Sequence, residues 1–337
     1  MRALRLCAIL LAQIVLRVGD AGASPELAAA AATRELQLRL IAQQSHVRPG
    51  QTLLVALEQQ LAPGWHTFWR NPGDAGQATV IEWMLPEGAE AGPILWPLPA
   101  RIEQRIGGLV VSSYGYEGQV LLLSEILVPR RLRPGEYFKL EASVSWLVCG
   151  EVCLAQEVAL QMRLPVAAQP QDSEHAKRLA AAFAALPASA PWPVEAQAVD
   201  GGLRLRWGDA ATGAMATSGQ FFPDGQGLVR HAASRAIARD GARWRLDLAP
   251  GETQGESLSE STPDAGQSLD GLLVLGEGAN ARAYQVHAPV LAGPPAPLPT
   301  RWMDPWRAGG LLLLAMALLY RFARRRAAAA RPRACSD

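Results

Sequence analysis

Apolar and polar side chains alternate in short runs through the first half of the chain, and this pattern restricts the fold more than any other feature. The clearest runs cover residues 36–40, 53–57, 140–148 and 158–164. Successive side chains of a strand point to opposite faces, so a period of two indicates strands buried on one face. Turns containing proline and glycine separate the runs. We therefore predict an all-β chain with an antiparallel β-sandwich over residues 24–168.

A second, smaller β domain is predicted over residues 194–290. A helical and proline-rich connection, residues 169–193, precedes it. Asp172 or Ser173 can cap the short alanine-rich helix of this connection, and Pro187 ends it. The expected strands of the second domain are residues 202–207, 228–231, 242–248, 272–275 and 283–287.

Residues 1–23 have the three parts of a secretory signal peptide. Arg2 and Arg5 form a basic start, residues 6–16 form an apolar centre, and Ala21-Gly22-Ala23 offers a cleavage site with small residues. A buried N-terminal helix is the alternative. Cys7 lies in the apolar centre and is expected to leave with the peptide.

A membrane anchor is predicted near the other end, over residues 306–323. Its apolar core, residues 308–320, is shorter than the roughly 20 residues of a typical span, and flanking arginines and tryptophans can extend it. A proline-rich stalk, residues 291–305, precedes the anchor, and the basic tail 324–337 is expected on the cytoplasmic side. A buried or interfacial helix is the alternative. The expected location is therefore the periplasm, on the outer side of the inner membrane, where disulfides can form.

Cys149 and Cys153 are the two cysteines that remain for such a compartment, since Cys335 lies in the predicted cytoplasmic tail. Strands on either side place the pair at a tight hairpin, where facing Cα atoms are close enough for a disulfide. The net charge of +1 gives no electrostatic reason to expect a nucleic-acid partner. No cofactor is expected.

Three uses of this pair remain open on the residues alone. A structural disulfide would close a loop of five residues and contribute only about 2 kcal/mol by chain entropy. Two thiolates can also bind a soft ion such as copper, although no histidine or methionine nearby has ligand spacing, so no metal site is assigned. The third use is reversible thiol–disulfide exchange with another protein.

Four separate motifs carry a resemblance to a known family. They are GWHTFWRNPGDAG at residues 64–76, ILWPLPARI at 94–102, YGYEGQVLLL at 114–123 and SWLVCGEVCL at 145–154. In this order and spacing they resemble the periplasmic N-terminal region of DsbD/ScsB thiol:disulfide interchange proteins, and the C-x3-C spacing is closer to ScsB. The resemblance implies an immunoglobulin-like sandwich and a redox role for Cys149 and Cys153.

The resemblance also implies partners. In this family the cysteine pair passes electrons from a polytopic membrane domain to periplasmic thioredoxin-like or disulfide-isomerase proteins, in contexts such as copper tolerance and cytochrome c biogenesis. The family's polytopic and thioredoxin-like domains are not found in this sequence. We therefore expect a separately encoded membrane electron donor; a truncated or orphaned relative of the family is the alternative. A non-catalytic binding or assembly module with a structural disulfide is the alternative.

Aromatic side chains and a histidine are candidates to surround the pair. Trp65, His66, Trp69 and Trp146 are predicted to shield or orient the cysteines, and aromatic packing at an edge of the sandwich, with a hydrogen-bonded histidine, is the alternative. His66 could also give a proton to a leaving thiolate. Tyr114 and Tyr116, expected in a turn, are candidates for a rim on which a partner docks.

Overall fold

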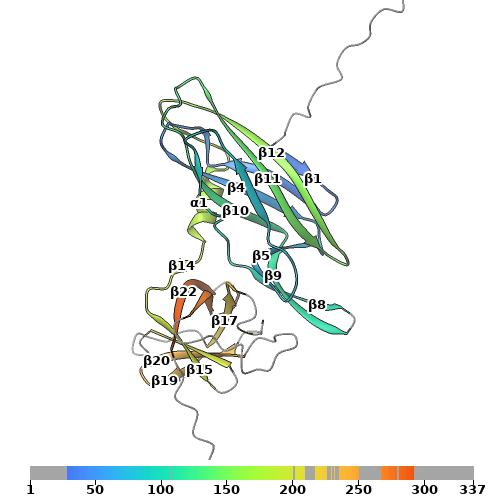
Figure 1. Ribbon diagram of the computed structural model, residues 1–337, viewed down its shortest axis with the longest axis vertical. Helices are drawn as coiled ribbons and strands as arrows, with labels where there is room; N and C mark the ends of the chain where they lie inside the picture. Colours follow the sequence, from blue (N-terminus) through green and yellow to red (C-terminus); the bar gives the residue numbers. More distant parts are fainter. Residues whose placement is uncertain are drawn as a thin grey trace, which may run out of the picture. The chain divides into compact units, whose positions relative to one another are not determined.

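The computed structural model describes residues 29–106, 108–199, 202–208, 217–225, 229, 231, 235–249, 267–278 and 281–291. This part of the chain consists mostly of β-strands, and α1 (Ala176–Ala184) is its one α-helix (Figure 1). The predicted β class is therefore confirmed. The signal peptide, the stalk after residue 291, the anchor, the tail and both Cys7 and Cys335 lie outside the described residues. Within the described ranges, no helix has the length and apolar character needed to cross a membrane.

Two sheets form the sandwich. The first has the order β1-β2-β4-β10-β7, with β1 (Ala30–Ala32), β2 (Leu36–Ala42), β4 (Thr52–Leu61), β10 (Gln119–Leu127) and β7 (Glu90–Ala91). The second has the order β12-β11-β5-β9-β8, with β12 (Cys153–Pro165), β11 (Tyr137–Cys149), β5 (His66–Gly73), β9 (Leu109–Glu117) and β8 (Ala100–Ile106); β6 (Val80–Met84) also pairs with β11. β3 (Gln44–His46) and β13 (Gln171–Asp172) form a separate two-stranded sheet.

The alternation in the sequence explains the packing of the sandwich. Along β11 every second side chain from Phe138 to Val148 is buried, and these side chains meet apolar residues of the first sheet such as Leu57 and Leu122 in one core. β4 is buried on both faces, because α1 covers its outer side. There Leu179 of the helix packs with Leu54 and its neighbours. Because both faces of β4 are covered, this strand is apolar along most of its length and does not alternate.

A third sheet follows the helix. Its order is β18-β17-β21-β22-β15-β16-β20-β19. The strands are β18 (Arg235–Ala236), β17 (Ser218–Pro223), β21 (Ser268–Leu275), β22 (Arg282–Leu291), β15 (Val194–Val199), β16 (Gly202–Trp207), β20 (Arg243–Leu248) and β19 (Ala238–Asp240), and β14 (Ala188–Ser189) pairs with β22. The predicted strand 228–231 falls largely outside the described residues.

The third sheet contacts the sandwich through the end of β5. The Asn71 side chain, 1% exposed, donates hydrogen bonds to the carbonyls of Pro223 at 2.7 Å and Gly225 at 3.0 Å. Phe222 packs edge-to-face against Trp69 and Tyr114, with ring centroids 6.2 and 4.9 Å apart. These contacts are buried and specific, so β5 belongs to the packing of both regions.

Two local predictions were wrong. Tyr114 and Tyr116 lie within β9 and not in a turn, which begins only at Gly118. Gly115 separates them because a side chain there would meet the Thr67 carbonyl oxygen, 2.1 Å from the position of a Cβ. Asp172 belongs to β13 and does not cap the helix, whose N-cap is His175. Ser173 instead accepts a hydrogen bond from the His175 backbone and donates one to the carbonyl of Ala42.

Candidate redox site

The hairpin of β11 and β12 ends in a disulfide. Its ladder runs without a break from Tyr137↔Pro165 to Cys149↔Cys153, and this last pair is bonded, with Cα atoms 4.1 Å apart. A three-residue loop joins the two cysteines, and the Gly150 amide donates to the Val152 carbonyl across it at 3.0 Å. The long hairpin therefore fixes the position of both sulfurs.

The two halves of the disulfide differ in exposure. Cys149 is 1% exposed, whereas Cys153 and the loop residue Val152 are exposed. Thiol–disulfide exchange requires a thiolate to approach one sulfur in line with the S–S bond, so access decides which sulfur reacts. The arrangement leaves Cys153 as the cysteine that an incoming thiolate can reach.

Cys149 has a histidine on its other side. His66 is the residue opposite Cys149 in the pairing of β5 with β11, and Glu117 is opposite His66 in the pairing of β5 with β9. Directly opposed residues of antiparallel strands share a face of the sheet. Cys153, Cys149, His66 and Glu117 therefore form a row across four strands, which we call the cross-strand row.

The histidine of this row is enclosed and incompletely bonded. His66 is 2% exposed, and its Nε2 atom is buried without a hydrogen-bond partner among the described residues. Burial lowers the pKa of His66 below its ordinary value of 6.5, and the nearby Glu117 carboxylate offsets part of that effect. The ring is therefore neutral near pH 7.

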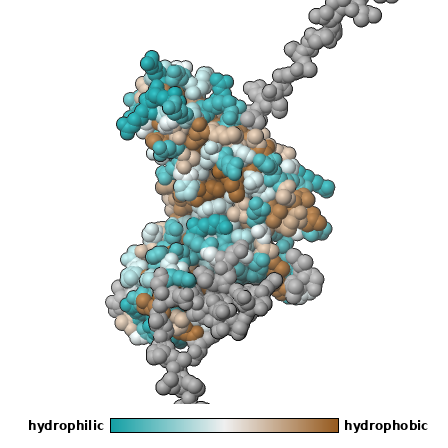
Figure 2. Space-filling model, in the orientation of Figure 1, coloured by the Kyte–Doolittle hydropathy of each residue, from teal (hydrophilic) through white to brown (hydrophobic). Residues whose placement is uncertain are grey.

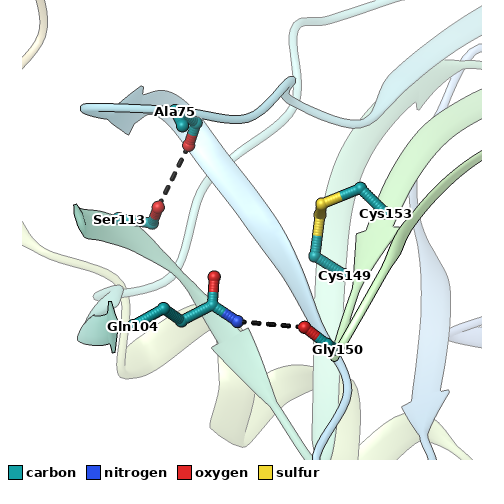
Figure 3. The surroundings of a disulfide bond; sticks show 6 residues. All are labelled: Ala75, Gln104, Ser113, Cys149, Gly150 and Cys153. Carbon is teal, nitrogen blue, oxygen red and sulfur yellow. Dashed lines mark hydrogen bonds between the residues drawn. A yellow bond between two sulfur atoms is a disulfide. The ribbon is translucent and has the colours of Figure 1, made fainter. Parts of the chain in front are cut away.

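The loop between the cysteines is held from two sides. A Cβ on Gly150 would lie 3.1 Å from the Trp65 ring, so this glycine lets the ring lie against the loop. From β8, Gln104 donates a hydrogen bond to the Gly150 carbonyl at 3.2 Å (Figure 3). Ser113 of β9 donates to the Ala75 carbonyl at 3.0 Å and ties the β8–β9 hairpin to the chain after β5.

The other predicted neighbours are core residues. Trp69 and Tyr114 are fully buried and face Phe222, and Tyr114 Oη lies 2.8 Å from His231 Nδ1. Tyr116 is buried, donates to the Pro97 carbonyl and stacks on Trp96. Trp146 belongs to the inner core as well. Of the predicted set, the structure thus brings Trp65 and His66 to the disulfide, and the burial of both tyrosines disagrees with a place on a docking rim.

Sequence reasoning missed Glu117 and Gln104. Both depend on the pairing of β5, β8 and β9, which a local pattern does not reveal; the alternation at residues 100–106 could have indicated the strand that carries Gln104. Exposed apolar side chains near these elements are Val110 of β9 and Val152. On the face drawn in Figure 2, apolar and polar surface are interspersed. No group of three or more potential metal ligands occurs within the described ranges.

Comparisons with known proteins support the β-sandwich fold. The family model "Thiol:disulfide interchange protein DsbD, N-terminal" matches residues 37–165. The crystal structure of the N-terminal periplasmic domain of ScsB from Proteus mirabilis aligns with a TM-score of 0.53 at 19% identity, over 76% of this chain and 94% of that one. No curated protein sequence matches the chain.

Two further solved structures align with far lower scores. The titin domains z1z2 in complex with telethonin give a TM-score of 0.19 at 9% identity, over 78% of this chain and 100% of that one. The E. coli chaperone DraB gives 0.18 at 11% identity, over 75% and 97%. Neither alignment supports an inference. The sandwich, its cysteine hairpin and the family match at residues 37–165 together identify a DsbD/ScsB-like N-terminal domain in this chain.

Proposed function

We propose that this chain exchanges thiols and disulfides with protein partners through Cys149 and Cys153. The observation that carries the proposal is the disulfide at the tip of the hairpin, with one buried and one exposed cysteine, inside a DsbD/ScsB-like domain. A disulfide used only as a staple has no need of an accessible half. Closing so short a loop would also add only about 2 kcal/mol.

The exchange proceeds in two steps. A thiolate of a reduced dithiol protein attacks Cys153, the Cys149–Cys153 bond breaks, and its electron pair goes to Cys149, which leaves as a thiolate and takes up a proton. The partner's second thiolate then attacks the mixed disulfide and releases Cys153. The partner ends as a disulfide and the pair ends as two thiols. Running the same steps backwards reduces an oxidised client protein.

The proposed partners and location follow from the similarity to the DsbD/ScsB N-terminal domain. The electron donor is a separately encoded polytopic membrane protein, and the acceptors are periplasmic thioredoxin-like or disulfide-isomerase proteins. The chain acts in the periplasm, anchored to the inner membrane by residues 306–323.

Single-cysteine variants of the full chain test the proposal. The probe is a thioredoxin-like protein that lacks its own resolving cysteine and whose remaining cysteine is held as a mixed disulfide with 5-thio-2-nitrobenzoate, so that attack by the variant's thiolate releases thionitrobenzoate. Cys149→Ala leaves the exposed thiol and is expected to trap the probe as a mixed disulfide at least tenfold faster than Cys153→Ala. A native pair that stays oxidised in buffers poised below about −300 mV would show a structural disulfide instead. Equal trapping by both variants would refute the assignment of Cys153 as the attacked residue.

A further inference from the structure

The cross-strand row contains one buried polar atom that has no hydrogen-bond partner among the described residues. His66 lies opposite Cys149 on the neighbouring strand, and within the described part of the chain its Nε2 atom has no hydrogen bond while the disulfide is closed. A buried polar group that lacks a partner destabilises the state in which it is unpaired. The unpaired His66 nitrogen therefore destabilises the oxidised protein.

Opening the disulfide changes what His66 can contact. A bonded sulfur is a weak acceptor and has no proton to donate, whereas a thiolate accepts a hydrogen bond strongly and a thiol can donate one. Directly opposed residues of an antiparallel pair have Cβ atoms about 4.5–5.5 Å apart, which is within reach of an imidazole and a sulfur. A neutral ring can serve either form, through its N–H or through its free nitrogen.

We propose that His66 hydrogen-bonds the Cys149 sulfur when the disulfide opens, and so stabilises the reduced form of the pair. This inference rests on the proposed exchange at Cys149 and Cys153, and it assigns the leaving sulfur its partner. When the S–S bond breaks, its electron pair goes to Cys149, and the His66 N–H stabilises that thiolate until a proton arrives from solvent.

Packing alone does not account for the histidine. His66 meets Phe68 edge-to-face, with ring centroids 5.0 Å apart, and a phenylalanine at position 66 would make the same contact without an unpaired nitrogen. The unpaired Nε2 atom thus destabilises the oxidised protein, and packing does not require it. Burial keeps the pKa of His66 low, which keeps the ring neutral and able to act as donor or acceptor.

Glu117 completes the row on the solvent side. Its side chain is exposed, and it is the carboxylate opposite His66 on β9. It is also the charged group that acts on the pKa of His66. The carboxylate thus acts on the enclosed ring through its charge.

The reduction potential of the pair tests the inference in the full chain. The ratio of oxidised to reduced protein is measured by thiol trapping across a series of dithiothreitol buffers. His66→Phe is expected to shift the equilibrium about tenfold toward the disulfide, which for two electrons is a potential lower by about 30 mV. His66→Gln, whose amide places a donor near the position of Nε2, is expected to stay within about threefold of the native protein.

A remote histidine supplies the matched control. His287 lies on β22 with its side chain 74% exposed, so His287→Phe makes the same chemical change away from the disulfide and is expected to leave the potential unchanged. An unshifted potential in His66→Phe would overturn the inference. A shift of equal size in His66→Gln would also overturn it, because it would show that lost packing, and not a lost hydrogen bond, moves the potential.

A second measurement uses the native protein and does not depend on how a variant folds. With 15N-labelled histidine, the His66 Nε2 resonance is expected to move when the pair is reduced, and an unmoved resonance would overturn the inference. The proposed function fails on a different result. If no protein dithiol exchanges with the pair while its potential with dithiothreitol still depends on His66, exchange is refuted and the role of His66 stands.

Discussion

Gln104 donates a hydrogen bond to the carbonyl of Gly150, at 3.2 Å, from one strand of the β8–β9 hairpin to the loop between the two cysteines. The bond joins segments 46 positions apart in sequence. It holds the loop in the position in which Trp65 lies against Gly150 and in which Cys149 is buried. Access to the disulfide therefore depends on a contact outside the hairpin that carries it.

Removing this contact should make the disulfide more accessible than the exposure of Cys153 alone allows. A hydrogen bond of this kind contributes about 1 kcal/mol, so Gln104→Ala is expected to increase the rate at which dithiothreitol reduces the pair about fivefold. Trapping the free thiols at successive times after dithiothreitol is added measures this rate. Gln119→Ala is a suitable control, because Gln119 bonds Glu58 and Gln60 on the first sheet. An unchanged rate in Gln104→Ala would mean that the hairpin does not restrict access.

Gly115 is expected to tolerate no side chain. The Cβ of Gly115→Ala would lie 2.1 Å from the Thr67 carbonyl oxygen, which belongs to the neighbouring strand and cannot move without separating the sheet. We expect a loss of about 1–3 kcal/mol in the free energy of unfolding, measured by urea denaturation. Gly92→Ala, whose nearest contact would be 3.4 Å, is the control and should change stability far less.

Asn71 should stabilise the contact between the sandwich and the third sheet. Asn71→Ala leaves the carbonyls of Pro223 and Gly225 without their buried donor, and a loss of about 1–3 kcal/mol is expected. The half-exposed ion pair of Arg70 and Asp224 lies beside it. Its removal by Arg70→Gln should cost no more than about 1 kcal/mol. Denaturant unfolding compares the two; equal losses would contradict the burial argument.

Acid should destabilise the fold partly through His231. Burial lowers the pKa of this imidazole below 6.5, Asp74 raises it in part, and Arg101 lowers it further. Because the unfolded chain takes up the proton more readily, the stabilising contribution is complete above pH 6.5 and is lost as the pH falls through the lower folded pKa. The slope from one such group is at most about 1.4 kcal/mol per pH unit.

His231→Gln should therefore reduce the loss of stability between pH 7 and pH 5. Urea unfolding at several pH values measures that loss. A slope that His231→Gln does not alter would place the acid sensitivity elsewhere.

The sequence predicted those parts of the structure that depend on neighbours along the chain. Alternation from Leu140 to Val148 predicted the strand and its buried face, and the strands on either side of Cys149 and Cys153 placed them at a hairpin. Both rest on contacts between residues that one turn brings together. A family resemblance added the redox role, which remains a proposal here.

What the sequence did not reveal depends on pairing between distant strands. His66 reaches Cys149, and Glu117 reaches His66, only through the register of β5 with β11 and β9, and that register shifts between Phe68 and Gly73. The glycine between Tyr114 and Tyr116 suggested a turn, because its close approach to Thr67 is invisible without the neighbouring strand. Turn chemistry and close strand contact both select glycine, and a single sequence does not separate them.

Exposure at only one end of the disulfide restricts the order of events in the proposed relay. A donor and an acceptor would both need Cys153, and two proteins of ordinary size do not fit on one hairpin tip together. Each would have to leave before the other arrives. Steady-state rates with the two partners varied independently would then give the parallel lines of a ping-pong reaction, with no complex of all three proteins.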